Sequence, residues 1–120
     1  MVNISNLGIL NLTRGDDCIF YGELRDGDNL DFVKYIADER DEIYFGIMEP
    51  NQPFENAIVR KKLSKKNIIE ENILVLEINS LDTINLIPGA YYYQFKLNRY
   101  TDSGFKINTL NPKSLLYIEE

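Results

Sequence analysis

Carboxylates in short polar stretches are the side chains of this 120-residue chain that could perform acid–base chemistry. They stand in three places: Asp16 and Asp17, Asp26 and Asp28, and the segment 38–42. Paired carboxylates move protons in catalysis when a cleft holds them together and shifts their pKa values. All of these residues lie in stretches that we expect to be turns, where Asp hydrogen-bonds to the nearby backbone. We therefore predict structural roles for them, and no enzyme.

Nucleophilic and metal-centred chemistry have little support in the sequence. The chain has one cysteine, Cys18, and no histidine. A catalytic thiol normally needs a histidine base, and zinc sites use several Cys or His ligands. Cys18 opens an apolar run, so we predict a buried structural thiol without an intramolecular disulfide. The segment 26–28 resembles part of a calcium loop but lacks the bidentate Glu. We predict no cofactor and keep Ca²⁺ in these loops as an alternative.

Basic and aromatic residues are the ones that indicate binding. A basic segment spans residues 60–66 and usually such a run faces water, although it can also dock an acidic partner. Tyrosines on the outward parity of a strand can anchor a protein interface or stack on a sugar. We predict a candidate interface that combines both kinds of residue: Tyr44, Tyr92, Arg60, Lys61, Lys62, Lys65 and Lys66.

The element that must position Tyr92 is the strand expected within residues 86–97. Pro88-Gly89 is a turn signal, and large apolar residues then occupy every second position. A Tyr two residues before a large inward residue is typical of strand F in immunoglobulin-like sandwiches. Here Tyr91 precedes Tyr93, which occupies the place of the cysteine in antibody domains. The stretch therefore predicts such a sandwich without its inter-sheet disulfide.

Turn signals at roughly ten-residue spacing predict further strands. The expected ranges are 7–13, 18–24, 42–48, 56–63, 72–78, 105–110 and 113–118, with 29–35 ambiguous. Residues 72–78 are apolar at both parities, which indicates a strand buried on both faces. Gly22 is a possible bulge. The pattern predicts an all-β, antiparallel, immunoglobulin-like sandwich of seven to nine strands, forming one domain over residues 1–120.

A short helical turn is expected at residues 80–83, just before the strand that contains Tyr91. Three apolar residues stand in or after this turn, namely Leu81, Ile84 and Leu86. We expect them to close the end of the core, at the place where immunoglobulin-like folds cross from one sheet to the other.

Composition and charge restrict the classes of partner. A net charge of −6 disfavours nucleic acid and anionic membranes, because polyanions repel an acidic surface. No stretch approaches the ~20 apolar residues that span a bilayer. The segment 1–6 has neither the basic region nor the apolar core of a secretory signal. We therefore expect folding in a reducing cytoplasm.

Four stretches, taken in order, resemble a known group of proteins. They are 11–17, 41–47, 88–95 and the late segment 112–115. Their order is similar to that of small structural proteins of tailed bacteriophages and prophages of Gram-positive bacteria, and to the N-terminal β-sandwich of baseplate upper protein-type subunits. Such families carry no catalytic residues, so the resemblance transfers none. The chain departs from the baseplate subunits because it stops after the sandwich, without a helical stalk or receptor-binding domain.

The resemblance implies a non-catalytic virion module that is assembled in the host cytoplasm. Its partners would be other phage structural proteins, and it would form a homo-oligomer within a symmetric assembly. The implied role is attachment of fibres to the tail or baseplate, or capsid decoration. Two alternatives stay open: a carbohydrate-binding module that uses exposed aromatics, and an inhibitor directed at a host protein.

Overall fold

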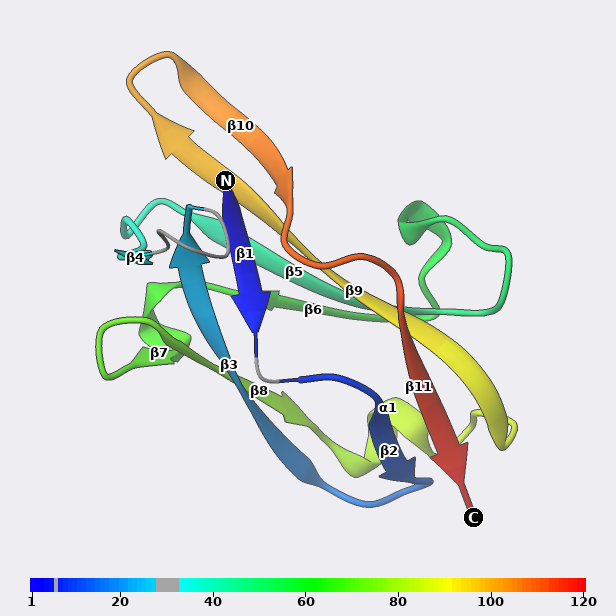
Figure 1. Ribbon diagram of the computed structural model, residues 1–120. Helices are drawn as coiled ribbons and strands as arrows, with labels where there is room; N and C mark the ends of the chain where they lie inside the picture. The colour runs from blue at the N-terminus through cyan, green and yellow to red at the C-terminus, as the bar shows by residue number, and fades with distance from the viewer. Residues whose placement is uncertain (6, 28–32) are drawn as a thin grey trace.

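The computed structural model describes residues 1–5, 7–27 and 33–120, and it consists of two β-sheets packed face to face (Figure 1). Sheet A contains β1 (Val2–Ser5), β3 (Cys18–Asp26), β4 (Val33–Lys34), β7 (Ile68–Ile69) and β8 (Ile73–Ile78). Sheet B contains β2 (Leu10–Thr13), β5 (Glu42–Met48), β6 (Val59–Leu63), β9 (Gly89–Thr101), β10 (Gly104–Thr109) and β11 (Ser114–Glu119). Short helical turns are η1 (Phe54–Asn56), η2 (Lys65–Asn67) and α1 (Ser80–Thr83). The predicted all-β sandwich is confirmed at this level.

The number of strands and the direction of one of them differ from the prediction. Sheet A has the order β1-β3-β8-β7 and sheet B the order β2-β11-β9-β5-β6; β4 pairs with β3, and β10 pairs with β9. The described residues thus form eleven strands, not seven to nine, partly because β4 and β7 are too short to show a period. The sandwich is also not wholly antiparallel, because β2 runs parallel to β11.

The parallel pair arises where the first segment of the chain crosses between the sheets. β1 pairs with β3 in sheet A, whereas β2 lies beside β11 in sheet B (Figure 1). Gly8 lies between them with φ of 60°, a conformation that favours glycine. The hydroxyl of Tyr93 donates a hydrogen bond to the carbonyl of Gly8 and holds the crossing against sheet B. The strand predicted at 7–13 corresponds to β2 alone, and the pattern of the sequence did not predict β1.

Aromatic side chains of sheet B form the centre of the core. Tyr91, Tyr93 and Phe95 point inward at alternating positions of β9, as predicted. The ring centroids of Phe45 and Phe95 are 4.9 Å apart, and Tyr93 meets Phe95 edge-on at 6.2 Å. Leu74, Leu76 and other buried residues of sheet A complete the same cluster.

Two predictions in sheet A are wrong. Gly22 forms no bulge: it pairs in register with Leu74, and a Cβ at this position would lie 2.5 Å from Cδ1 of Ile4. The glycine therefore permits close approach of β1. β8 is also not buried on both faces, because Ile73 and Val75 are only partly buried while the opposite parity is fully packed.

The helical turn forms as expected, but it does not close the core as predicted. Leu81 is 82% exposed and Ile84 is also exposed, whereas Leu86 packs partly against the core. The buried residue of the turn is Thr83, whose Oγ1 accepts a hydrogen bond from Gly15 N at 2.9 Å. A polar residue suits this place because it binds the backbone of the β2–β3 turn. Of the ambiguous segment 29–35, residues 29–32 lie outside the described part, and Val33–Lys34 form β4.

Candidate interaction surfaces

Tyr44 lies on the outer face of sheet B, among basic side chains. It occupies β5, directly opposite Lys62 of β6 and Lys96 of β9. Its side chain is partly buried. Arg60 points to the same outer face two residues before Lys62, so the structure brings Tyr44 together with part of the predicted basic segment.

Tyr92 belongs to a separate part of the same face. The β5–β6 connection folds over Gly46, where an added Cβ would lie 2.8 Å from Cε2 of Phe54 and 3.0 Å from Cβ of Ala57. The glycine thus leaves room for η1. Tyr92 lies beyond this cover, opposite Met48 and Leu115. The structure therefore does not unite Tyr44 and Tyr92 in one surface.

The basic residues of β6 are engaged within the chain. Lys61 has the inward parity and reaches out of the sandwich to Asp82 of α1, with Nζ 2.6 Å from Oδ2. Lys62 pairs with Glu42 at 2.7 Å, and this hydrogen bond lowers the pKa of Glu42 and raises the pKa of Lys62. The guanidinium of Arg60 donates to the carbonyl of Glu55. These contacts connect the edge strand β6 to α1, β5 and η1.

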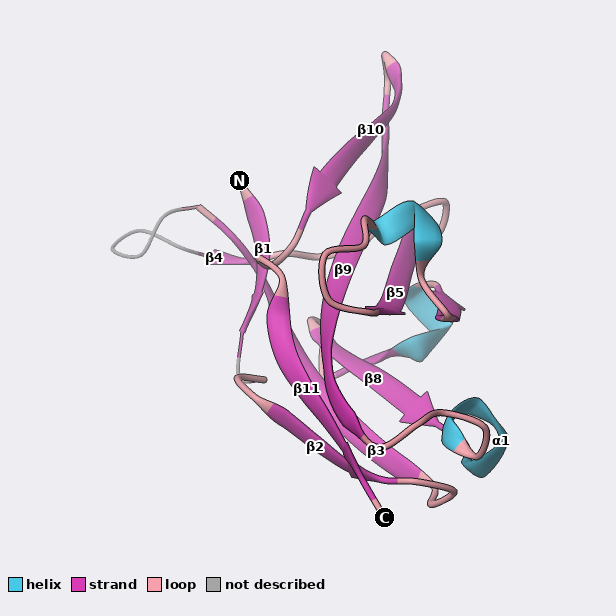
Figure 2. Ribbon diagram, turned by 90° about the vertical axis from the view of Figure 1, so that its right-hand side faces the viewer, coloured by secondary structure: helices cyan, strands magenta, loops and turns pink. Residues whose placement is uncertain are grey.

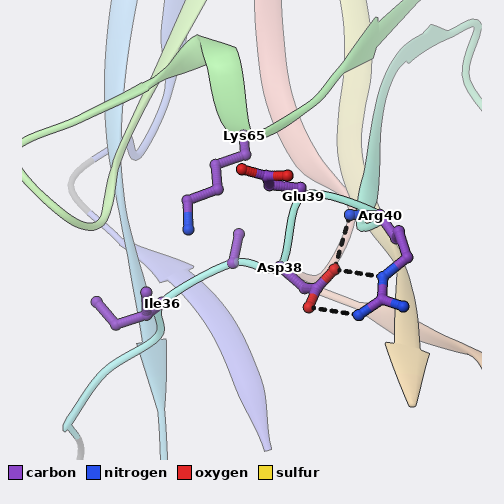
Figure 3. Close-up of a pocket in the computed structure, with 6 residues that line it drawn as sticks. Ile36, Asp38, Glu39, Arg40 and Lys65 are labelled. Carbon is purple, nitrogen blue, oxygen red and sulfur yellow. Dashed lines mark hydrogen bonds and ion pairs between the residues drawn. The ribbon is translucent and has the colours of Figure 1, made fainter. Parts of the chain in front are cut away.

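Lys65 and Lys66 lie apart from the other predicted residues, on η2 at one end of the sandwich. Lys65 and the segment 36–40 line an open depression (Figure 3). Within it, the carboxylate of Asp38 accepts hydrogen bonds from Nε and Nη2 of Arg40 at 3.0 and 3.2 Å. These bonds lower the pKa of Asp38 to about 2, so it is ionised at neutral pH and cannot act as a general acid there.

Asp41, next to this depression, is a buried structural carboxylate. Its Oδ2 accepts hydrogen bonds from the Tyr35 hydroxyl at 2.5 Å and from Asp38 N at 3.0 Å, and its Oδ1 accepts one from Tyr100 N at 2.7 Å. Burial, and then the hydrogen bond to Asp41, raise the pKa of Tyr35. This arrangement ties the loop before β5 to the end of β9, which agrees with the structural role predicted for this segment.

The other acidic turns also have structural partners. Asp17 Oδ1 accepts a hydrogen bond from Ser80 N at 2.6 Å, which joins the β2–β3 turn to α1. Asp26 pairs with the amino group of Met1 at 3.1 Å. Asp28 lies outside the described residues. Within residues 1–5, 7–27 and 33–120, no group of three Cys, Asp or Glu side chains is arranged to hold a metal ion.

Cys18 is less buried than predicted. It is partly exposed at the start of β3, although it packs against the core. Burial, followed by the charges of Asp16 and Asp17, raises the pKa of its thiol. The thiol is therefore a poor nucleophile at neutral pH.

The sequence analysis did not identify an apolar surface on the outer side of sheet A. Ile19 and Tyr21 of β3 are 50% and 53% exposed. Tyr21 lies opposite Val75, and Ile73 lies opposite the exposed Ile69 of β7. We call these five residues the sheet A face. Its signal in the sequence was the apolar character of β8 at both parities.

Acidic side chains surround the sheet A face. Glu77 lies opposite Ile19, and both line a shallow hollow together with Asp17. Glu70 and Glu71 are exposed in the turn between β7 and β8. Two basic side chains also lie at this border: Lys34 pairs with Glu71 at 3.8 Å, and Arg25 pairs at 3.3 Å with Glu23, which lies opposite Ile73. The face thus has an apolar centre and a border in which acidic residues outnumber basic ones. Among the described helices, none has the length and apolar character needed to cross a membrane.

Comparison with known proteins identifies no family. No family model matches the sequence, and no curated protein matches it. Among solved structures, the chain is similar to AggA, the major subunit of aggregative adherence fimbriae type I from Escherichia coli. The two are 12% identical over 98% of this chain and 94% of AggA, with a TM-score of 0.36. At this TM-score the likeness says nothing about function.

Proposed function

We propose that this chain is a non-catalytic module that binds another protein through the sheet A face. The observation that carries this proposal is the two-sided apolar character of β8. One side packs into the core, while Ile73 and Val75 on the other side lie beside the half-exposed Ile19 and Tyr21. A contiguous exposed apolar area with a polar border is typical of a protein interface.

The acidic border indicates the chemistry of the partner. Two copies meeting through the sheet A face would bring together two mainly acidic borders, which include Glu70 and Glu77. Such like-charge contacts oppose association. The partner therefore carries an apolar centre bordered by Lys or Arg, and its binding weakens as salt concentration rises.

We infer that the sandwich is immunoglobulin-like. The order β1-β3-β8-β7 corresponds to strands A, B, E and D of that fold, and β11-β9-β5-β6 to G, F, C and C′. At the start of β9, the Tyr91 hydroxyl donates to the carbonyl of Ile87 at 2.5 Å. This is the hydrogen bond of a tyrosine corner. Tyr93 follows in the place of the usual cysteine.

We further propose a bacteriophage virion as the setting, with attachment of tail or baseplate fibres or capsid decoration as the role. The strand and turn motifs resemble those of phage structural proteins, which supports this setting. A module that binds another protein through the proposed sheet A face would also suit such a role. In a symmetric particle many copies bind together, so each contact can be modest. Mass spectrometry of purified particles tests this setting; absence of the chain from intact virions contradicts it.

The sheet A face is tested by comparing Tyr21→Glu with Tyr117→Glu. Tyr117 is an exposed tyrosine on the outer face of sheet B and serves as the matched control. We expect Tyr21→Glu to lower incorporation into particles at least about tenfold, because a carboxylate in an apolar interface loses its hydration. Tyr117→Glu should be incorporated like the wild type. Equal incorporation of the two variants would show that the binding face lies elsewhere.

The two alternatives make different predictions. A carbohydrate-binding module would use Tyr44 and Tyr92, but the β5–β6 connection stands between them, and no observation here favours it. Loss of glycan binding in Tyr44→Ala or Tyr92→Ala would support that alternative. Purification of the chain with a host enzyme and without virion proteins would support an inhibitor.

A further inference from the structure

Strand β10 is the outer strand of a hairpin that extends beyond the body of the sandwich (Figures 1 and 2). It pairs with β9 on one side; no described strand pairs with its other side, although β1 contacts β10 and Ile4 N donates to the carbonyl of Leu110, directly after β10, at 3.0 Å. Two large apolar side chains on this strand are exposed, Phe105 to 53% and Ile107 to 75%. An apolar strand with an open edge is a template for pairing with another chain.

The register shows which backbone groups face the open side. Leu110 N donates to Phe95 O at 2.9 Å, so the N–H group of the residue after β10 faces β9, while Leu110 O accepts from Ile4 N of β1 and Phe95 N donates to Asn111 Oδ1. Hydrogen-bonded and non-hydrogen-bonded pairs alternate in an antiparallel ladder. Because the register is constant up to the turn, Lys106 is bonded to β9. Phe105 and Ile107 consequently direct their N–H and C=O groups away from β9.

The other edge strands have features that discourage pairing between molecules. β6 has three basic residues among its five, Arg60, Lys61 and Lys62. β7 is two residues long, and β1 and β2 have four residues each. β10 has six residues, a single charge at Lys106, and no proline. Among the described strands it is therefore the edge with least protection against intermolecular pairing.

The single charge of β10 disfavours one register of pairing with a second copy and is compatible with an axis at Ile107. In an antiparallel pair of β10 strands, the residues whose N–H and C=O groups point away from β9 must lie opposite one another, because these groups form the hydrogen bonds between the strands. A two-fold axis at Lys106 would set two ammonium groups side by side, which is unfavourable. An axis at Ile107 instead sets this residue opposite its own copy and Lys106 opposite Asn108. Phe105 then faces Thr109, and no like charges are paired.

We propose that two copies of this chain associate by antiparallel pairing of their β10 strands about a two-fold axis at Ile107. The pairing joins the B sheets of both copies and satisfies the outward backbone groups of Phe105 and Ile107. Such an interface is isologous, so it closes on itself and does not propagate. The contact is separate from the sheet A face and does not depend on the function proposed for that face.

A cysteine cross-link tests the axis directly. In the proposed register, the two Ile107 residues form a hydrogen-bonded pair with Cα atoms ~5.5 Å apart, a separation that a disulfide can span. Ile107→Cys, in a Cys18→Ser background, should give a disulfide-linked dimer under mild oxidation. Ile87→Cys is the matched control, because Ile87 is 78% exposed and lies outside β10. Absence of the dimer at position 107, or equal cross-linking at both positions, overturns the proposal.

Sedimentation velocity tests the contact without a covalent bond. The wild type should pass from monomer to dimer as its concentration rises, and Ile107→Lys should weaken the dimer at least about tenfold. Ile87→Lys should behave like the wild type, as should Tyr21→Glu, which changes only the sheet A face. Circular dichroism confirms that each variant is folded. A wild type that stays monomeric up to ~1 mM, or an equal loss in Ile87→Lys, contradicts the proposal.

Discussion

Asp41 shows what a single buried carboxylate does in this chain. Its two oxygens accept hydrogen bonds from the Tyr35 hydroxyl and from the backbone N–H groups of Asp38 and Tyr100. The side chain is 1% exposed, and the three donors replace the water that a carboxylate loses on burial. It therefore acts as a fixed link between a loop and β9.

The substitution Asp41→Asn should destabilise the fold by about 2–3 kcal/mol, because the amide nitrogen would face a donor and leave a buried group unsatisfied. Urea unfolding followed by tyrosine fluorescence measures the change. Asp38→Asn is the control: this carboxylate is more exposed and pairs with Arg40 at the surface, so the loss should be much smaller. Equal losses would show that Asp41 has no special role.

At the scale of elements, the start of β9 depends on one hydroxyl. Tyr91 bonds to the carbonyl of Ile87 and so fixes the turn through Pro88 before the long strand begins. The sequence pattern already pointed to this residue. The structure adds the partner, which lies four positions earlier in the chain.

Replacing Tyr91 by Phe should lower the free energy of unfolding by about 1 kcal/mol, the usual contribution of one such hydrogen bond. The neighbouring Tyr92→Phe offers a close control, since its hydroxyl makes no hydrogen bond within the described residues, and its effect should stay within about 0.5 kcal/mol. Thermal unfolding measures both. A larger effect at position 92 would argue against the tyrosine corner.

At the scale of the whole molecule, one aromatic cluster joins the two sheets. Phe95 contacts Phe45 and Tyr93, and the buried residues of sheet A pack in the same cluster. Because β9 borders β5 on one side and β11 and β10 on the other, its inward residues support most of sheet B.

We expect Phe95→Ala to cost about 3–5 kcal/mol, the range for removal of a buried aromatic ring. Phe105→Ala removes the same ring from the exposed strand β10, and should cost less than about 1 kcal/mol in dilute solution. Chemical denaturation with two probes, circular dichroism and fluorescence, should show coincident transitions for both sheets. Separate transitions would mean that the sheets do not share one core.

The sequence by itself determined those features that depend on local parity and turn chemistry. Alternation in β5 and β9 predicted their inward residues correctly, because side chains of a strand alternate between faces whatever the strand's neighbours are. Of the predicted turn at Pro88-Gly89, Pro88 forms a bend, whereas Gly89 is already the first residue of β9. Asp38 and Asp41 bind nearby backbone N–H groups, as expected for carboxylates in turns, whereas Asp17 binds the distant backbone of Ser80.

Only the tertiary structure decided which apolar parity is covered and which strand lies beside which. Residues 72–78 are apolar on both sides, but packing against sheet B fully buries only one side and leaves Ile73 and Val75 partly exposed. The crossing of the first segment, the separation of Tyr44 from Tyr92 and the open edge of β10 have the same origin. Each depends on contacts between residues far apart in the chain, which local pattern does not encode.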